Sequence, residues 1–341
     1  MDRESKELQS LGSIGIYKES FKIIFSWRKI FTKITFALIL PYTFIFLAYT
    51  LVSDILFSNI INNSRLLQDG ISSEERVTIW LVKVAYLVFS VIFSLLYTSA
   101  VVYTTASFNT TKEPTFKKVM TIIPKVWKRY IVTYLWTFII LFLYTVIAMV
   151  FISLSLIFFV LGPLQTSKSS AALFNPGIVA GTVLLIVLVV LYFSGVVYMS
   201  TVWQFSWAIS VLEDCKGTKA MMKSKALLKG KMRVALAILF EFSIVLMMIQ
   251  FGFKKMVVEG EKLGMGMWIR VLSGIVCFLL LMQFFLFWMV VQTVFYIVCK
   301  SYHHECIDKS LLEDHLEVYG YVGEYAPLKI KDDVQLEQCD V

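Results

Sequence analysis

Long hydrophobic runs alternate along the chain with short polar segments. The six longest runs cover residues 34–57, 79–106, 130–161, 177–212, 232–253 and 271–299. Each exceeds the roughly 20 residues that a helix needs to cross about 30 Å of hydrocarbon. Backbone polar groups must be satisfied inside lipid, and the runs lack two-residue alternation, so we expect helices rather than β-strands. The pattern predicts an all-α protein with six transmembrane helices.

Composition points the same way. The chain is 58% hydrophobic and 16% charged, and its mean hydropathy is +0.75. A soluble domain is about half apolar and about a quarter charged. Lipid is therefore expected to be the solvent for much of the surface, and the chain is predicted to be an integral, multi-pass membrane protein.

Positive charge is distributed unevenly between the two sides of the predicted spans. Twenty Lys and Arg residues lie in the segments before the first, third and fifth spans, whereas eight lie in the other three connections. Basic loops tend to stay in the cytosol. We therefore expect both termini to be cytosolic, in the endoplasmic reticulum and related endomembranes or in the plasma membrane. Asn62 is a candidate N-glycosylation acceptor on the opposite side, whereas Asn109 falls on the cytosolic side and is expected to stay unmodified.

Each basic segment also carries apolar residues at helical spacing, with lysines between them. Such a pattern is typical of an amphipathic helix lying in the membrane interface. We expect three repeated units, each a basic interfacial helix followed by a helical hairpin, over residues 13–110, 111–213 and 214–300. This organisation gives a cytosolic segment at 1–33, a six-helix membrane domain at 34–299 and an acidic cytosolic tail at 300–341.

The lysines of the second and third basic helices are candidates for contact with anionic lipids of the cytosolic leaflet, where a basic residue contributes about 1 kcal/mol. They are Lys117, Lys118, Lys125, Lys219, Lys223 and Lys229. Alternatively, these charges only enforce orientation. No nucleic-acid-binding module is recognisable, so no nucleic acid is expected as a partner. Residues 301–341 hold ten acidic residues against three lysines, which makes the tail a candidate docking arm for a protein partner. Nothing in the pattern predicts an oligomeric state.

The segment after the fourth span resembles a known sequence pattern. The matching positions are Glu213, Gly217, Ala220, Ser224, Leu228 and Gly230. They are distantly similar to the membrane domain associated with some bacterial glycerophosphodiester phosphodiesterases. Residues 300–310 and 324–329 resemble the tail of a plant-specific family of uncharacterised six-span membrane proteins. These resemblances imply a six-span architecture and carry no established activity.

Catalytic chemistry is not predicted. The bacterial phosphodiesterases need a separate catalytic domain with acidic metal ligands and histidines, and no segment here is long enough to hold one. The three histidines, His303, His304 and His315, all lie near the C-terminus. There is no glycine-rich phosphate loop and no nucleophile beside a base. We therefore expect a protein that is not an enzyme and uses no metal or other cofactor.

Glu241 is the most informative polar residue, because it lies near the middle of the fifth span. A charge at that depth costs at least about 2.5 kcal/mol, so an intramembrane acid is a functional candidate. We expect it to be protonated or to be hydrogen-bonded within a polar site. The candidate partners are Thr98, Tyr198, Gln204 and Gln283. The site would be linked to protons or substrate, or would simply clasp two helices together.

Two functions follow from these features. The first is a non-enzymatic membrane protein that organises lipid or partner proteins at the cytosolic leaflet. The alternative is a transporter or lipid-handling protein with an intramembrane site near Glu241. A polar cavity at mid-depth would favour the second function, and a tightly packed bundle would favour the first.

Overall fold

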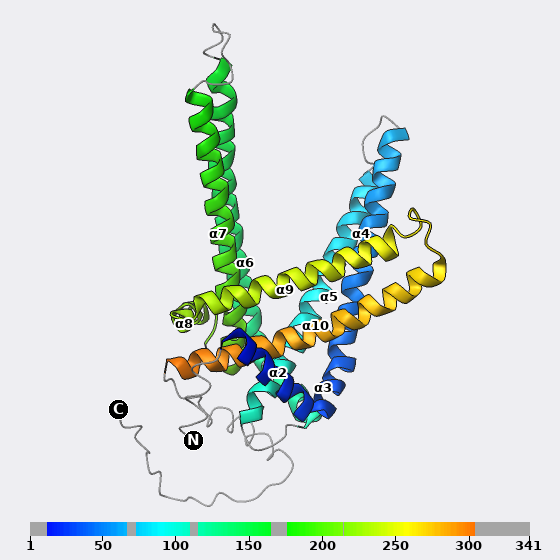
Figure 1. The fold of residues 1–341 in the computed structure, drawn as a ribbon, viewed down its shortest axis with the longest axis vertical. Coiled ribbons are helices and arrows are strands. Elements are labelled where there is room, and N and C mark those ends of the chain that lie inside the picture. Colours follow the sequence, from blue (N-terminus) through cyan, green and yellow to red (C-terminus); the bar gives the residue numbers. More distant parts are fainter. Residues whose placement is uncertain (1–11, 67–72, 110–114, 165–175, 214, 304–341) are drawn as a thin grey trace, which may run out of the picture. The chain divides into compact units, whose positions relative to one another are not determined.

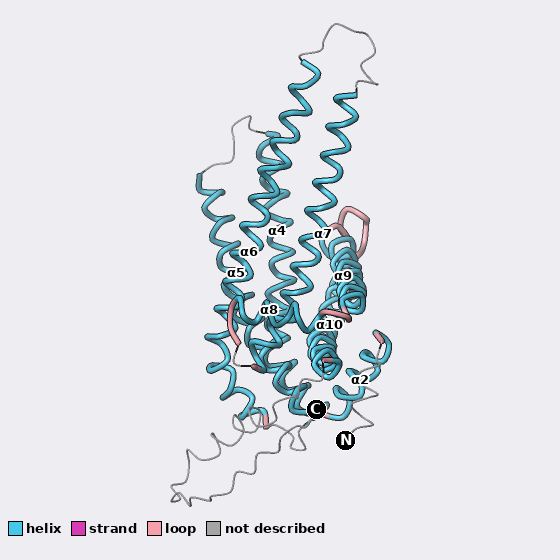
Figure 2. The backbone as a smooth tube through the Cα atoms, turned by 90° about the vertical axis from the view of Figure 1, so that its left-hand side faces the viewer, coloured by secondary structure: helices cyan, strands magenta, loops and turns pink. Residues whose placement is uncertain are grey.

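The described part of the chain is helical, with short turns between helices. The computed structural model describes residues 12–66, 73–109, 115–164, 176–213 and 215–303 (Figures 1 and 2). Within these ranges there is no β-strand. The elements are α2 (Ser13–Ser26), α3 (Arg28–Ile34), the π-helix η1 (Thr35–Ile39), α4 (Leu40–Leu66), α5 (Ser73–Ala106), the 3-10 turn η2 (Ser107–Asn109), α6 (Phe116–Leu164), α7 (Pro176–Leu212), α8 (Thr218–Leu228), α9 (Met232–Phe253), the π-helix η4 (Lys254–Val258) and α10 (Met267–Tyr302).

Among the described residues, six helical stretches are long and apolar enough to cross a membrane. They are Arg28–Asp54, Val77–Ala106, Val126–Ile157, Val179–Leu212, Met232–Val258 and Met267–Tyr302. Their outer faces carry large apolar side chains that are exposed in the protein alone, such as Phe142 on α6 and Leu184 on α7. An apolar surface of this extent fits lipid rather than water. The predicted all-α class with six membrane-spanning helices is thus confirmed, and the chain is a multi-pass membrane protein.

The core lies around the second half of α10. Every residue from Met289 to Lys300 is buried, as expected for a helix that is apolar on all sides and packed within a bundle. α10 packs against α2, α4, α5, α7 and α9. Aromatic rings fill these contacts, for example Phe295 against Phe205 of α7, with ring centroids 4.9 Å apart. The C-terminal end of α10, with Lys300, therefore lies inside the packed part of the protein.

The second basic segment does not form a separate helix. α6 runs without interruption from Phe116 to Leu164, so the lysines at its start belong to the same helix as the third span. Between Phe116 and the apolar run there is no glycine to end a helix. The third basic segment does form its own helix, α8, because Gly217 and Gly230, both with positive φ, interrupt the chain on either side. The prediction of a discrete interfacial helix before the third span was therefore wrong.

Candidate functional site

The short basic helix α8 is fixed to the bundle at its start by a glycine. Gly217 has φ +61°, a conformation that glycine adopts without a steric cost. Its N–H donates to Thr133 Oγ1 of α6 at 2.9 Å, and the same hydroxyl lies 2.8 Å from Ser210 Oγ of α7. A Cβ on Gly217 would lie 3.0 Å from the indole of Trp136. The start of α8 is thus held against both α6 and α7.

The end of α8 is held by a second glycine and by a histidine. Gly230 has φ +95°, and a Cβ there would lie 3.0 Å from the ring of Tyr302. His303 Nε2 lies 3.0 Å from the carbonyl oxygen of Leu227 and 3.1 Å from that of Lys229. Because carbonyl oxygens only accept, His303 donates from Nε2, which satisfies backbone groups at the end of a helix that would otherwise lack partners.

One face of α8 is buried against the neighbouring spans. Ala220 and Ser224 are fully buried, and Leu227 and Leu228 are almost so. Ser224 donates from Oγ to the carbonyl oxygen of Val202 on α7 at 2.7 Å. A small side chain at 220 and a hydroxyl at 224 therefore let α8 lie close to α7. Together with Glu213, all six positions of the resemblance pattern lie at contacts that hold α8 in place.

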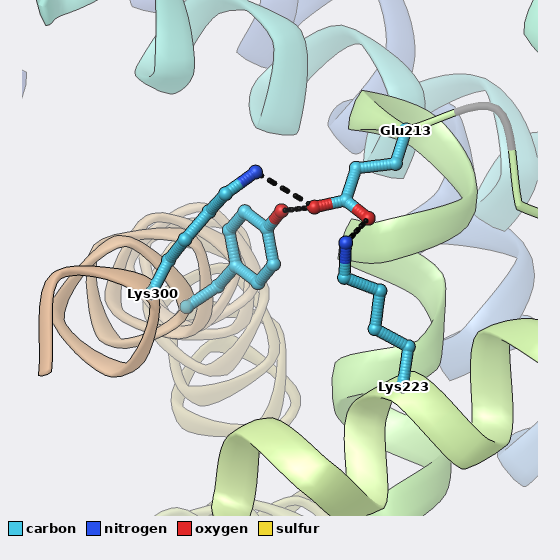
Figure 3. A network of polar contacts seen from close by, with 4 residues as sticks. Glu213, Lys223 and Lys300 are labelled. Atoms are coloured by element: carbon cyan, nitrogen blue, oxygen red, sulfur yellow. Dashed lines mark hydrogen bonds and ion pairs between the residues drawn. The ribbon is translucent and has the colours of Figure 1, made fainter. Parts of the chain in front are cut away.

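A buried cluster of charges joins α7, α8 and α10 (Figure 3). Glu213, just after α7, forms an ion pair with Lys223 of α8 at 2.7 Å and with Lys300 of α10 at 2.8 Å. Tyr296 donates from its hydroxyl to Glu213 Oε1 at 2.6 Å. The Glu213 side chain is 11% exposed, that of Lys300 8% and that of Lys223 33%. We call these four residues the Glu213 cluster.

The Glu213 cluster keeps its carboxylate charged. Burial by itself would raise the pKa of Glu213, but the contacts from Lys223, Lys300 and Tyr296 outweigh burial and hold the pKa below its ordinary value. One carboxylate between two ammonium groups leaves the cluster with a formal charge of about +1 at neutral pH. Its chemistry is therefore that of a charged clamp between three helices, and not that of a proton donor.

The opposite face of α8 is basic and exposed. Lys219, Lys225 and Met222 lie on it, and Met222 is 70% exposed. Lys216 and Lys229 are also exposed and flank the helix, just before Gly217 and just after Leu228. We call these five residues the cationic face. A row of lysines around an apolar side chain is the composition of a helix that touches a lipid headgroup layer.

The six lysines predicted to contact anionic lipid have different environments. Lys117, Lys219 and Lys229 are exposed. Lys223 instead turns toward Glu213 and serves the clamp. The side chains of Lys118 and Lys125 lie outside the described residues, and so does that of Asn62, the predicted glycosylation site.

Glu241 is exposed at the surface of α9, and its partner comes from another part of the chain. The hydroxyl of Tyr17 on α2 donates a hydrogen bond to Glu241 Oε2. The Tyr17 ring also packs near Phe242 and Phe287. Burial, followed by the hydrogen bond to Glu241, raises the pKa of Tyr17 well above its ordinary value, so the phenol keeps the proton that it donates.

The four side chains expected around Glu241 are dispersed. Thr98 is buried on α5, Gln204 is half-buried on α7, and Tyr198 and Gln283 are exposed on α7 and α10. In the part of the chain that the structure describes, none of them is hydrogen-bonded to Glu241. Depth along a span therefore did not predict which side chains meet.

Sequence reasoning pointed to Glu213 but missed Lys300 and Tyr296. A signal for them was present. Lys300 is a lysine at the end of an otherwise apolar helix, and Tyr296 is four residues earlier and so on the same helical face. The described residues include no group of three or more His, Cys, Asp or Glu side chains placed to hold a metal ion.

The fold and the cluster together define an all-helical membrane protein with six apolar helices and a basic helix clamped beside them. Residues 1–339 match the family described as "Domain of unknown function (DUF8558)", and the chain belongs to that family. No curated protein and no solved structure matches the chain. The family description assigns no activity.

Proposed function

We propose that this is a non-enzymatic integral membrane protein that organises lipid or partner proteins at the cytosolic leaflet. The observation that carries the proposal is the position of the cationic face. α8 is held by the Glu213 cluster, by two glycines and by Ser224, so the two exposed lysines and Met222 on it, and the two lysines that flank it, are presented on a fixed support. A fixed array of charges loses little conformational freedom when it binds a charged surface.

The proposal includes an orientation. The bias of Lys and Arg between connections supports cytosolic termini, with α2, the start of α6 and α8 all on the cytosolic side of three hairpins. The membrane would be an endomembrane, such as the endoplasmic reticulum, or the plasma membrane. The resemblances to a plant-specific family and to the membrane domain of bacterial phosphodiesterases enter only as likeness of architecture. The acidic tail is proposed as the docking arm for a protein partner.

Lipid binding by the purified full-length protein tests the proposal. We expect native mass spectrometry to detect phosphatidylserine retained in preference to phosphatidylcholine. The triple variant Lys219→Gln, Lys225→Gln, Lys229→Gln should retain at least about tenfold less phosphatidylserine, because each lysine near an anionic leaflet contributes up to about 1 kcal/mol. Added salt should weaken retention by the unsubstituted protein as well, since exposed charges are screened.

A second triple variant provides the matched control. Arg65→Gln, Lys168→Gln, Lys262→Gln removes the same number of charges from the connections assigned to the opposite side. Its phosphatidylserine retention should equal that of the unsubstituted protein. Equal losses in both triple variants would mean that only net charge matters, and the proposal for α8 would be abandoned.

The alternative function is a transporter or lipid-handling protein with a site near Glu241. It is favoured by one observation, the hydrogen bond from Tyr17 of α2 to a carboxylate within the fifth span. Because α2 lies outside the spans and contacts an acid within one, a movement of α2 would change the surroundings of Glu241 during a transport step.

Glu241→Gln tests this alternative by removing the charge while keeping the shape of the side chain. We expect the rate at which a fluorescent phospholipid crosses the bilayer in proteoliposomes to fall to the protein-free rate, with accumulation of the protein unchanged. Tyr17→Phe keeps the carboxylate and removes its donor, so it should retain part of the rate. Full movement in Glu241→Gln would leave Glu241 as a contact between helices only.

A further inference from the structure

A cavity lies between α4 and the end of α9, at positions that neither proposed function uses. Its volume is about 370 Å³, within the range of cavities that hold small ligands. Six of the residues that line it carry a polar group, and Met247 and Phe251 are apolar. The polar residues are Tyr49, Thr50, Ser53 and Asp54 from α4, Gln250 from α9 and Lys254 at the start of η4.

Two opposite charges face each other in this wall. Lys254 Nζ lies 3.2 Å from Asp54 Oδ1, with side chains that are 49% and 25% exposed. The other carboxylate oxygen, Asp54 Oδ2, is buried and has no hydrogen-bond partner among the described residues. A buried acceptor without a donor is costly. The pair therefore leaves one carboxylate oxygen of Asp54 without a donor, while a quarter of the Asp54 side chain stays exposed.

The pair joins the ends of two spans. Asp54 is the last residue of the stretch Arg28–Asp54, and Lys254 lies four residues before the end of Met232–Val258. A charged side chain at the end of a span can reach the interface, where a headgroup or solute is accessible. Lys254 is also the first residue of a π-helix, a geometry that is frequent at functional positions.

We propose that this cavity binds a zwitterionic group, which places its ammonium against Asp54 and its phosphate or carboxylate against Lys254. A zwitterion is proposed because its two charges match those of Asp54 and Lys254. A simple anion would lie beside Asp54 and a simple cation beside Lys254, whereas a zwitterion meets an opposite charge at both ends. The hydroxyls of Thr50 and Ser53 and the amide of Gln250 supply further hydrogen bonds. The zwitterion is the headgroup of a phospholipid or a free solute.

Binding to the purified full-length protein separates these sources. The probes are short-chain phosphatidylethanolamine, the matching phosphatidylglycerol, and phosphoethanolamine without acyl chains. Either ethanolamine probe should bind at least about tenfold more tightly than phosphatidylglycerol, a difference that one charge-assisted contact can supply. Binding of the lipid alone assigns a lipid site, binding of phosphoethanolamine alone a solute site, and binding of both assigns recognition of the headgroup itself.

Variants test the residues. Asp54→Asn and Lys254→Gln should each weaken binding of the ethanolamine probe about tenfold or more. Ser53→Leu fills the cavity without touching either charge, and it should abolish binding while thermal stability is kept; it decides the question if Asp54→Asn does not fold. Lys255→Gln is the matched control, because Lys255 pairs with Glu259 at 2.6 Å and does not line the cavity. No preference over phosphatidylglycerol, or unchanged binding in Ser53→Leu, would overturn the proposal.

Discussion

Glu213 shows how much of the packing near α8 depends on a single side chain. Its two carboxylate oxygens receive Lys223, Lys300 and Tyr296, which belong to two different helices. Lys300 is buried, and a buried ammonium group without a counter-ion is far more costly than an exposed one. Glu213 therefore stabilises the fold chiefly by neutralising Lys300, which would otherwise be buried without a counter-ion.

Glu213→Gln should lower the stability of the protein by about 3 kcal/mol, because it leaves Lys300 buried without a negative charge. Thermal unfolding of the protein in detergent measures the loss. Lys223→Gln is the matched comparison. It should cost less, since Glu213 keeps Lys300 and since Lys223 is a third exposed and partly screened by solvent.

The stability of the same variant should also depend on pH differently from that of the unsubstituted protein. The pKa of Glu213 in the folded protein lies below its ordinary value of 4.5, so the unfolded chain binds the proton more readily. Its stabilisation is fully present above that ordinary value and is lost as the pH falls through the lower pKa of the folded state. Glu213→Gln should lack this part of the acid destabilisation. An identical acid profile in the variant would mean that the carboxylate does not stabilise the fold.

At the scale of elements, glycine decides where a basic segment becomes a separate helix. Gly217 and Gly230 delimit α8 and let it lie flat against Trp136 and Tyr302. The basic segment at the start of α6 has no such residue and continues into the span. Glycine with positive φ thus separates α8 from the spans beside it, and the lack of such a glycine joins the second basic segment to the third span.

Gly230→Ala should destabilise the protein by about 2 kcal/mol, because alanine is strained at positive φ and its Cβ presses on Tyr302. Hydrogen exchange of the amides in α8 should accelerate at the same time. Gly264 is the control, since it also has positive φ, of +72°, but a Cβ there meets nothing within 4 Å. Gly264→Ala should cost about 1 kcal/mol, from strain alone, and leave exchange in α8 unchanged. Equal exchange in the two variants would contradict a role for Gly230 in docking α8.

Local patterns predicted these elements better than they predicted the site. Apolar spacing predicted a helix in the third basic segment, because that pattern lies within one helix, and Ala220, Leu227 and Leu228 of α8 are buried. The contacts of Glu213 and Glu241 join residues far apart in sequence. Lys300 is 87 residues from Glu213, and Tyr17 is 224 residues from Glu241. Periodicity gives the face on which a residue lies but not the helix that it meets, so these partners could not be deduced.

At the scale of the whole molecule, the six apolar helices follow from run length alone, since each predicted run overlaps one of the spans. The side of the membrane on which each end lies depends instead on charge outside the spans. The predicted orientation therefore depends on Lys and Arg in the connections and not on how the spans pack together.

Tags at the two termini should both be accessible from the cytosol, and a tag inserted after Lys262 should be accessible only from the opposite side. Complementation of a split fluorescent protein, with its second fragment targeted to either side, measures this directly. Asn109 serves as the internal control, because it should carry no glycan. A glycan on Asn109 would reverse the assigned orientation.

The π-helix η1 has a consequence for the geometry of the first span. A π-turn accommodates one residue more than an α-helical turn, so the residues that follow are rotated about the helix axis by about 100° relative to an uninterrupted α-helix. Tyr49 and Asp54 both follow η1. Straightening Thr35–Ile39 into an α-helix without removing a residue would turn both side chains to another azimuth, whereas deleting one residue there would keep their direction. The direction in which Asp54 points is thus set several turns away from the cavity that it lines.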